Sequence, residues 1–229
     1  MNRTTVQIDI VSDVVCPWCI IGYKQLQRAL GEFGERVKAD IRWHPFELNP
    51  EMPAEGQNLA EHIAQKYGSS PEQSRAARER MTALGAELGF AFNYSDESRM
   101  RNTYKAHQLL YWAGQLEPNT GQQTTLKLAL FDACFTEQKN VDDNQVLLDT
   151  VEHAGLDRAA AQAVLEDGRY RSEVKSEEAN WLERGIHAVP AFVFNQNSLL
   201  SGAQDSAVFV QVLTKLLEQA EEQQATVSH

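Results

Sequence analysis

The first part of the chain alternates hydrophobic and polar positions and then changes to helical spacing. Residues 6–11 alternate apolar and polar side chains and are rich in β-branched residues, which predicts a strand. From Tyr23 to Phe33 apolar residues recur every three or four positions, which predicts a helix that ends near Gly34. A second strand is predicted over residues 37–46. Because strand, helix and strand follow so closely, we expect a parallel βαβ unit.

The middle of the chain reads as a succession of helices. It opens with the turn-rich segment 49–53, which contains two prolines. Ser70 followed by Pro71 is typical of a helix start, with a capping side chain before a proline in the first turn. Helices are predicted over residues 59–67, 71–88, 101–115, 121–137, 143–154, 159–167 and 169–184.

The pattern then returns to strands. Residues 191–194 and 198–201 predict two strands joined by a turn, and residues 204–219 predict a closing amphipathic helix. The predicted fold class is therefore α/β: a thioredoxin-like fold (βαβ–ββα) with a large all-helical insertion between the second and third strands. The predicted domains are a discontinuous thioredoxin-like domain, residues 1–48 and 186–229, and an inserted helical domain, residues 49–185.

Composition narrows the function. The 229 residues include 21 Lys and Arg against 32 Asp and Glu, a formal net charge of −11, which argues against nucleic acid as a partner. No stretch approaches the roughly 20 apolar residues of a membrane span. The polar residues 1–5 run directly into the first strand and leave no room for an export signal, so a cytoplasmic location is expected.

The main chemical signal is Cys16-Pro17-Trp18-Cys19, placed between the first strand and the following helix. A cysteine at a helix N-terminus meets unpaired backbone N–H groups and the positive end of the helix dipole, which favour its thiolate. We expect Cys16 to be the attacking thiolate and Cys19, one turn on, to be the resolving thiol. Pro17 and Trp18 would tune the reduction potential.

Zinc binding is the competing interpretation of this motif. A structural zinc site needs four ligands, usually from a second pair of cysteines or closely spaced histidines. Cys134, the third cysteine, is isolated in an apolar helical run, where a small buried hydrophobe is the simpler interpretation, and the six histidines show no paired spacing. We therefore predict redox chemistry and no metal.

A second feature is Val189-Pro190, directly before the strand at 191–194. A proline may open a strand for local reasons alone. Together with the redox motif, it predicts a cis-proline that faces the cysteines. The backbone of Val189 would then pair with an extended substrate or with glutathione.

These residues together resemble the DsbA-like oxidoreductases of the FrnE type, which are related to 2-hydroxychromene-2-carboxylate isomerases and kappa-class glutathione transferases. The resemblance covers nearly the whole chain. The segments that carry it are residues 12–19, 21–22, 45–50, 52–53, 66–68, 102–103, 106–107, 189–194 and 201–204.

The resemblance implies a helical insertion lying over the active site. It also implies that Ser201, Gly202, Ala203 and Gln204 form the segment that contacts the γ-glutamyl end of glutathione in the glutathione-using relatives. Gln204 stands where those relatives more often carry an acid. The isomerases and transferases carry a serine where Cys16 stands, so a cysteine pair favours dithiol–disulfide exchange.

Three further residues are candidates for the cleft. Asp13, three residues before Cys16, would influence the thiolate or relay a proton, or else form a cap or turn. Asn102 and His107, five residues apart, would line the cleft from the insertion, or else make ordinary hydrogen bonds within it.

The sequence thus predicts a thiol–disulfide oxidoreductase of the reductase or isomerase kind acting on a disulfide-bearing protein or small molecule. Two alternatives stay open: a glutathione-dependent isomerase or transferase acting on a small aromatic or polyketide-like substrate, and a non-catalytic chaperone. No cofactor is expected to be bound obligatorily, although glutathione is a candidate co-substrate. The protein is expected to be a monomer or a homodimer.

Overall fold

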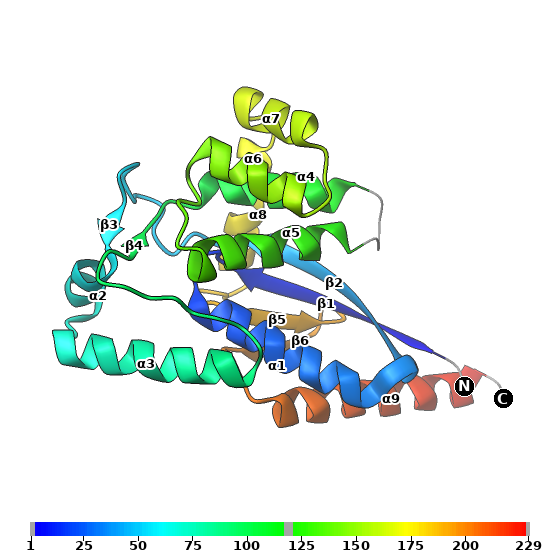
Figure 1. Ribbon diagram of the computed structural model, residues 1–229. Helices are drawn as coiled ribbons and strands as arrows, with labels where there is room; N and C mark the ends of the chain where they lie inside the picture. Colours follow the sequence, from blue (N-terminus) through cyan, green and yellow to red (C-terminus); the bar gives the residue numbers. More distant parts are fainter. Residues whose placement is uncertain (1–2, 117–120, 228–229) are drawn as a thin grey trace.

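The computed structural model describes residues 3–116 and 121–227 (Figure 1). Its main sheet has four strands in the order β2-β1-β5-β6. The elements around it are β1 (Thr4–Ser12), α1 (Pro17–Phe33), the short 3-10 helix η1 (Gly34–Arg36), β2 (Val37–Pro45), β5 (Ala191–Phe194), β6 (Ser198–Ser201) and α9 (Ser206–Val227).

The sheet has the predicted topology. β1 pairs in parallel with β2, where Ile10 lies opposite Trp43, and antiparallel with β5, where Ile10 lies opposite Phe192. β5 and β6 form an antiparallel hairpin. The chain reaches β5 only after the long insertion, so the thioredoxin-like fold class is confirmed.

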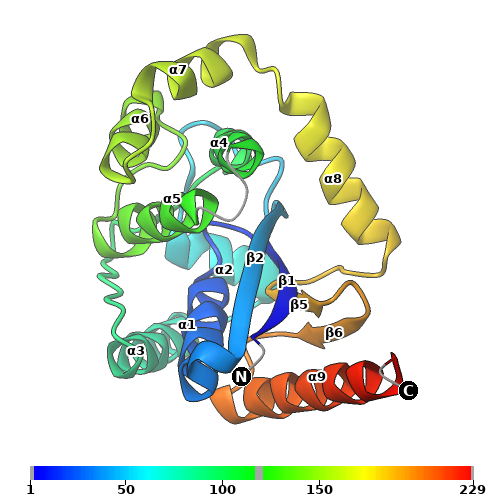
Figure 2. The same cartoon turned by 90° about the vertical axis from the view of Figure 1, so that its right-hand side faces the viewer.

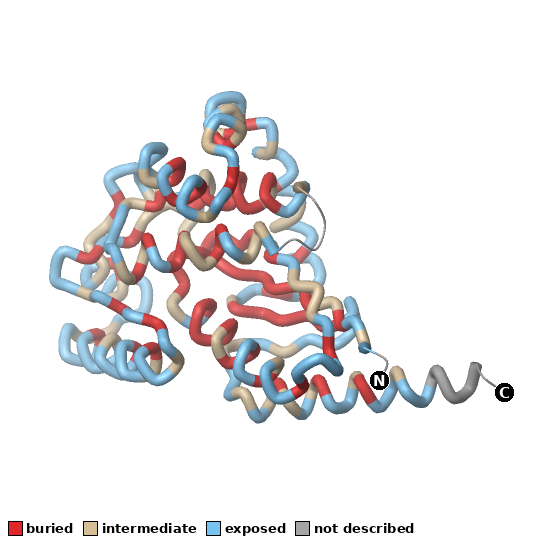
Figure 3. Tube along the Cα trace, turned by 45° about the vertical axis from the view of Figure 1, so that its right-hand side comes forward, coloured by how far each residue is buried: buried red, intermediate tan, exposed pale blue. Residues whose placement is uncertain are grey.

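The sheet and two helices share one core. Alternate residues of the central strand, Ile8 and Ile10, are fully buried, as are Phe192 and Phe194 of β5 and Phe209 of α9. The Phe209 ring meets the Phe192 ring edge-on, with centroids 4.9 Å apart. The period-two pattern of the strands therefore becomes a buried face under α1 and α9 (Figure 3).

The insertion connects β2 to β5. Its elements are β3 (Gln57–Asn58), α2 (Leu59–Tyr67), α3 (Pro71–Glu87), β4 (Arg99–Met100), α4 (Tyr104–Gln115), α5 (Gln122–Phe131), η2 (Asp132–Thr136), α6 (Asn144–His153), α7 (Arg158–Asp167) and α8 (Arg171–Glu183). Ser70 caps α3 with Pro71 in its first turn, as predicted.

Three details of the insertion differ from the prediction. It is not purely helical, because β3 and β4 form a two-residue antiparallel ladder, which is too short to show alternation. The helix predicted over 101–115 begins at Tyr104, because Asn102 accepts a hydrogen bond from the Tyr104 backbone N–H. The helix predicted over 121–137 changes after Phe131 into a single π-helical turn.

Helices α4 to α7 have a hydrophobic core of their own, which includes Leu109, Leu126, Leu147 and Val164. Val14, from the loop that precedes Cys16, is fully buried in this core. The insertion thus anchors the redox loop. The domain boundaries predicted at 48/49 and 185/186 stay a prediction. Across the described ranges, no helix is both long enough and apolar enough to cross a membrane.

Candidate active site

The two cysteines lie where β1 passes into α1. Cys16 is the N-cap of α1 and Pro17 is its first residue, so the proline occupies a position whose N–H needs no partner. Cys19 lies one turn on and donates its backbone N–H to the Cys16 carbonyl at 3.0 Å. Both cysteines are free thiols. Cys19 is fully buried and Cys16 is 3% exposed, whereas Trp18 between them is 48% exposed.

On one side of the pair lies the start of β5. The Val189-Pro190 peptide bond is cis, and the Cys16 Sγ lies 3.8 Å from the Val189 carbonyl oxygen, to which the thiol donates. The structure therefore brings together the two features that the sequence pattern linked, 173 residues apart.

The segment Ser201–Gln204 follows β6 and lies behind this proline. The Gly202 backbone N–H donates to the Pro190 carbonyl at 2.8 Å. The Gln204 side chain is exposed and donates to the Ser201 carbonyl, and Ala203 packs against the main core. The segment is thus connected to the cis-proline through Gly202. A glutathione contact for it stays a prediction.

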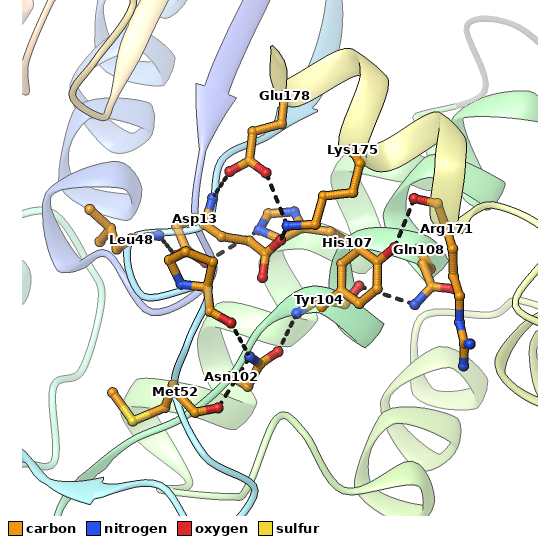
Figure 4. Close-up of polar contacts among 12 residues, drawn as sticks. Asp13, Leu48, Met52, Asn102, Tyr104, His107, Gln108, Arg171, Lys175 and Glu178 are labelled. Carbon is orange, nitrogen blue, oxygen red and sulfur yellow. Dashed lines mark hydrogen bonds and ion pairs between the residues drawn. The ribbon is translucent and has the colours of Figure 1, made fainter. Parts of the chain in front are cut away.

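On the other side of the pair, the insertion contributes buried charge. The Asp13 carboxylate accepts the Leu48 backbone N–H at 2.8 Å, and the His107 Nε2 lies 3.3 Å from its other oxygen (Figure 4). Asp13 is fully buried, which raises its pKa, but the hydrogen bonds from His107 and Leu48 and the nearby cations outweigh burial. The pKa of Asp13 is therefore lowered, and two of the proposed cleft residues, Asp13 and His107, form one buried hydrogen-bonded pair.

Lys127 of α5 completes this buried cluster, and the sequence analysis missed it. It is fully buried, and its Nζ donates to the Ser12 carbonyl at 3.4 Å. The same ammonium lies 5.4 Å and 5.0 Å from the ring centroids of Trp43 and Phe131. A lone lysine in the apolar run 126–131 was the signal that could have found it.

Burial lowers the pKa of Lys127 to about 8, although the charges of Cys19, Asp13 and Cys16 counteract that shift. The same cation acts on the thiols. Burial raises the pKa of Cys19, but hydrogen bonds from Cys16 and Ser12 and the charge of Lys127 lower it overall. The pKa of Cys16 is raised well above its usual value, by its hydrogen bond to Cys19, by burial and by the charges of Cys19 and Asp13.

The first ionisation of the pair is therefore easier than that of an ordinary thiol, and the two sulfurs share the remaining proton. A second ionisation is strongly opposed, because it would add another negative charge beside Asp13. Cys16 keeps 3% exposure and lies at the N-terminus of α1, whereas Cys19 is fully buried, so Cys16 is the more accessible of the two sulfurs.

Asn102 makes hydrogen bonds within the insertion, and its place in a cleft stays a prediction. Its amide nitrogen donates to the carbonyls of Pro50 and Met52, at 3.2 Å and 3.3 Å, and its oxygen accepts from the Tyr104 N–H (Figure 4). Asn102 therefore joins the 49–53 loop to the start of α4. This matches the alternative role left open for it, ordinary hydrogen bonding within the insertion.

Helix α8 is joined to the sheet by further charged contacts. His44 of β2 lies between Asp9, at 2.8 Å, and Glu177 of α8, at 2.5 Å. Next to it, Lys175 of α8 pairs with the buried Glu47 carboxylate at 2.5 Å. These contacts fix α8 against the C-terminal end of β2, close to His107.

Cys134 lies apart from the redox pair. It is half-buried in the π-helical turn and packs against the main core, and burial raises the pKa of its thiol to about 12. These properties fit the small hydrophobe that the sequence predicted. Across the described ranges, no group of three or more His, Cys, Asp or Glu side chains is arranged to hold a metal ion.

The chain belongs to the DsbA-like thioredoxin domain family, whose pattern it matches over residues 7–214. The FrnE-type resemblance fits within this family. The chain is similar in sequence to the uncharacterized protein YwbO of Bacillus subtilis (strain 168). The two are 26% identical over 211 residues, which cover 92% of this chain and 96% of YwbO.

Solved structures share the fold. The crystal structure of the probable DsbA oxidoreductase SCO1869 from Streptomyces coelicolor is 32% identical and superposes with a TM-score of 0.83, covering 92% of this chain and 89% of that one. A 2-hydroxychromene-2-carboxylate isomerase (15% identical, TM-score 0.64, 97% and 100% covered) has the same fold. So does the cytosolic disulfide reductase DsbM from Pseudomonas aeruginosa (17%, 0.60, 96% and 99%).

Proposed function

We propose that the protein catalyses dithiol–disulfide exchange, reducing or isomerising disulfides of proteins or small molecules. The observation that carries this proposal is the reduced pair itself. Cys16 and Cys19 lie in one turn at the start of α1, beside the cis Val189-Pro190 bond and next to a buried lysine. A thiolate, a resolving thiol and an adjacent backbone for docking are the three requirements of this chemistry.

In the proposed reaction, the Cys16 sulfur attacks one sulfur of the substrate disulfide, and the other sulfur leaves as a thiolate. The Cys19 sulfur then attacks Cys16, which releases the second substrate thiolate and leaves a Cys16–Cys19 disulfide. Two electrons pass to the substrate. Two molecules of a monothiol such as glutathione, oxidised to their disulfide, would return the pair to the dithiol.

Lys127 and Asp13 would regulate the proton in this cycle. With the pair reduced, the ammonium of Lys127 stabilises the shared thiolate, as the lowered pKa of Cys19 indicates. When the disulfide forms, that negative charge disappears and Lys127 keeps only Asp13 as a nearby acid. Lys127 would therefore stabilise the reduced form relative to the oxidised form.

A cytoplasmic location suits a reductase that is regenerated by glutathione, and we include both in the proposal. DsbM is a cytosolic disulfide reductase and has a structure with GSH. At 17% identity, that likeness supports the fold rather than the substrate. The Ser201–Gln204 segment, joined to Pro190 through Gly202, is the proposed site for the glutathione backbone.

The test is turnover of insulin with dithiothreitol or glutathione as the electron source, and of glutathione disulfide with dithiothreitol. We expect both activities in the wild type, and neither in Cys16→Ser. If Cys16→Ser keeps a glutathione-dependent isomerase activity, the isomerase alternative is supported instead. Suppression of protein aggregation that persists in Cys16→Ala and Cys19→Ala would favour the chaperone alternative.

A further inference from the structure

The outer edge of β2 faces a groove in the described structure. β2 is an edge strand of the sheet, so one side of its backbone has no strand beside it. The groove has a volume of about 1110 Å³. Figure 2 shows β2 between α4 and α5 on one side and α8 on the other. The groove is thus an open sheet edge enclosed by helices of the insertion.

The register decides which backbone groups face the groove. In a parallel ladder, the N–H and C=O of one residue point to the same side, and successive residues alternate. Trp43 points outward, because its N–H and C=O both bond to the Gln123 side chain, each at 2.9 Å. Ile41 and Ala39 therefore also point outward, whereas Arg42 and Asp40 point toward β1.

The amide of Gln123 acts here as a single peptide group of a neighbouring strand. It accepts from the Trp43 N–H and donates to the Trp43 carbonyl, and the Leu110 carbonyl, at 3.1 Å, helps to hold it in position. Ile41 and Ala39 present the same donor and acceptor pair further along the groove. Among the described residues, neither has a hydrogen-bond partner on this side. The Gln123 amide therefore occupies the place of an added strand beside Trp43, and the places beside Ile41 and Ala39 are open.

We propose that the groove binds an extended segment of a polypeptide substrate, which adds a fifth strand to the sheet beside Ala39 and Ile41. Backbone pairing of this kind gives affinity without requiring a particular sequence. The strand order puts β1 between this edge and β5, so the groove is separate from Val189. It would hold a part of the substrate distant from the reacting disulfide. The pairing of a polypeptide with the edge of β2 is independent of the proposed function, and only the identification of that polypeptide as a substrate rests on it.

The walls of the groove indicate a hydrophilic occupant. Hydroxyl and amide side chains are frequent on both sides, and four of the titratable residues already form two pairs, Arg42 with Asp40 and His44 with Glu177. The polar wall residues are Ser172, Ser176 and Asn180 on α8, and Gln122, Thr124 and Thr125 on α5. Apolar lining residues such as Ile41 and Tyr111 are interspersed with these polar groups, so the groove suits an extended, mainly polar chain better than an apolar helix.

Amide hydrogen exchange tests the docking without any redox reaction. The probe is reduced, carboxymethylated α-lactalbumin, an unfolded polypeptide whose cysteines are blocked. At saturation, we expect exchange at Ile41 and Ala39 to slow by about tenfold or more, and exchange at Arg42 and Asp40, already bonded to β1, to stay unchanged. No slowing at Ile41 and Ala39 overturns the proposal. Slowing that follows protein concentration without probe overturns it as well, in favour of a second copy.

Two substitutions extend the test to catalysis. Ile41→Pro removes the outward N–H but no bond to β1, and Ile41→Val is its matched control. Ser176→Trp fills the groove from the exposed face of α8, so the test survives if the proline variant does not fold. Both should raise the KM for a disulfide-bearing unfolded polypeptide about tenfold and leave glutathione-disulfide turnover unchanged.

An equal loss on both substrates would overturn the docking role. A wild type that turns over neither substrate would refute the proposed function, while the exchange experiment would still decide whether the groove binds polypeptide.

Discussion

The redox pair lies between two very different neighbours. Toward β5, Cys16 meets backbone: the Val189 carbonyl and, behind it, the Gly202–Pro190 hydrogen bond. Toward the insertion, the pair meets buried charge: Lys127 lowers the pKa of Cys19, and the Asp13 carboxylate raises the pKa of Cys16. A carbonyl and a peptide edge can hold a substrate but shift a thiol pKa little, whereas a buried cation does the reverse. If the proposed function holds, we expect substrate binding on the β5 side of the pair and control of thiol reactivity on the side of the insertion.

The largest expected effect comes from removing the thiols themselves. Cys16→Ser should lower disulfide turnover by at least about a thousandfold, because no other described thiol adjoins the docking backbone. Cys19→Ser should instead trap a mixed disulfide between Cys16 and the substrate, visible by intact-mass spectrometry. Cys134→Ala is the matched control and should retain activity. Trapping at Cys134 rather than Cys16 would contradict the assignment.

Lys127→Met removes the cation while keeping much of the side-chain volume. Turnover should fall about tenfold at pH 7, because the shared thiolate loses its nearest buried cation. The reduction potential should become more negative by roughly 30 mV for each 1.4 kcal/mol of lost stabilisation of the reduced form. Lys139→Met, at an exposed ion pair with Glu137, is the control. An unchanged potential would show that Lys127 is only structural.

Lys127→Met is expected to lower turnover but to increase the stability of the folded protein. A lysine with a folded pKa of about 8, lowered from 10.5, costs about 3 kcal/mol when charged and buried. Between pH 8 and 10.5, Lys127 binds more protons in the unfolded chain than in the folded protein. The contribution of Lys127 to the free energy of unfolding of the wild type therefore rises with pH in that range. Lys127→Met should raise the free energy of urea unfolding at pH 7 and abolish that rise between pH 8 and 10.5. Lower stability at pH 7 would contradict this explanation.

The sequence alone predicted much of the β5 side of the cysteine pair but little of the side formed by the insertion. The four strands of the main sheet, α1 and the link between the cysteines and Val189-Pro190 followed from hydrophobic spacing and from one motif, which are local signals. Lys127 could not be found in that way, because its burial depends on Ser12 and on rings that meet it only in the fold. Asp13 and His107 were each identified as candidates, but their pairing across 94 positions needed the structure.

His44 allows the connection between sheet and insertion to be tested by pH. Burial lowers its pKa, but hydrogen bonds to Asp9 and Glu177 outweigh burial and raise the pKa above the ordinary 6.5. The stabilisation is therefore fully present below pH 6.5 and is lost as pH rises through the folded value. The difference in unfolding free energy between wild type and His44→Asn should shrink across that window. A difference that is constant from pH 5 to 9 would mean that His44 contributes by packing alone.

The smallest expected effect concerns glutathione at the β5 side. Gln204 is exposed, two residues after Gly202, which bonds to Pro190, and Gln204→Glu would introduce the acid that the resemblance to glutathione-using relatives implies at this position. An exposed ion pair with the γ-glutamyl ammonium contributes about 0.2–1 kcal/mol, so the KM for glutathione disulfide should fall by about two- to fivefold. This gain in affinity should vanish in about 0.5 M salt, because at that ionic strength charges exposed to solvent are screened within a few ångströms. Turnover of insulin should not change. If KM is unaffected at low salt, the Ser201–Gln204 segment does not contact the γ-glutamyl end, and the backbone at Val189 alone holds the substrate.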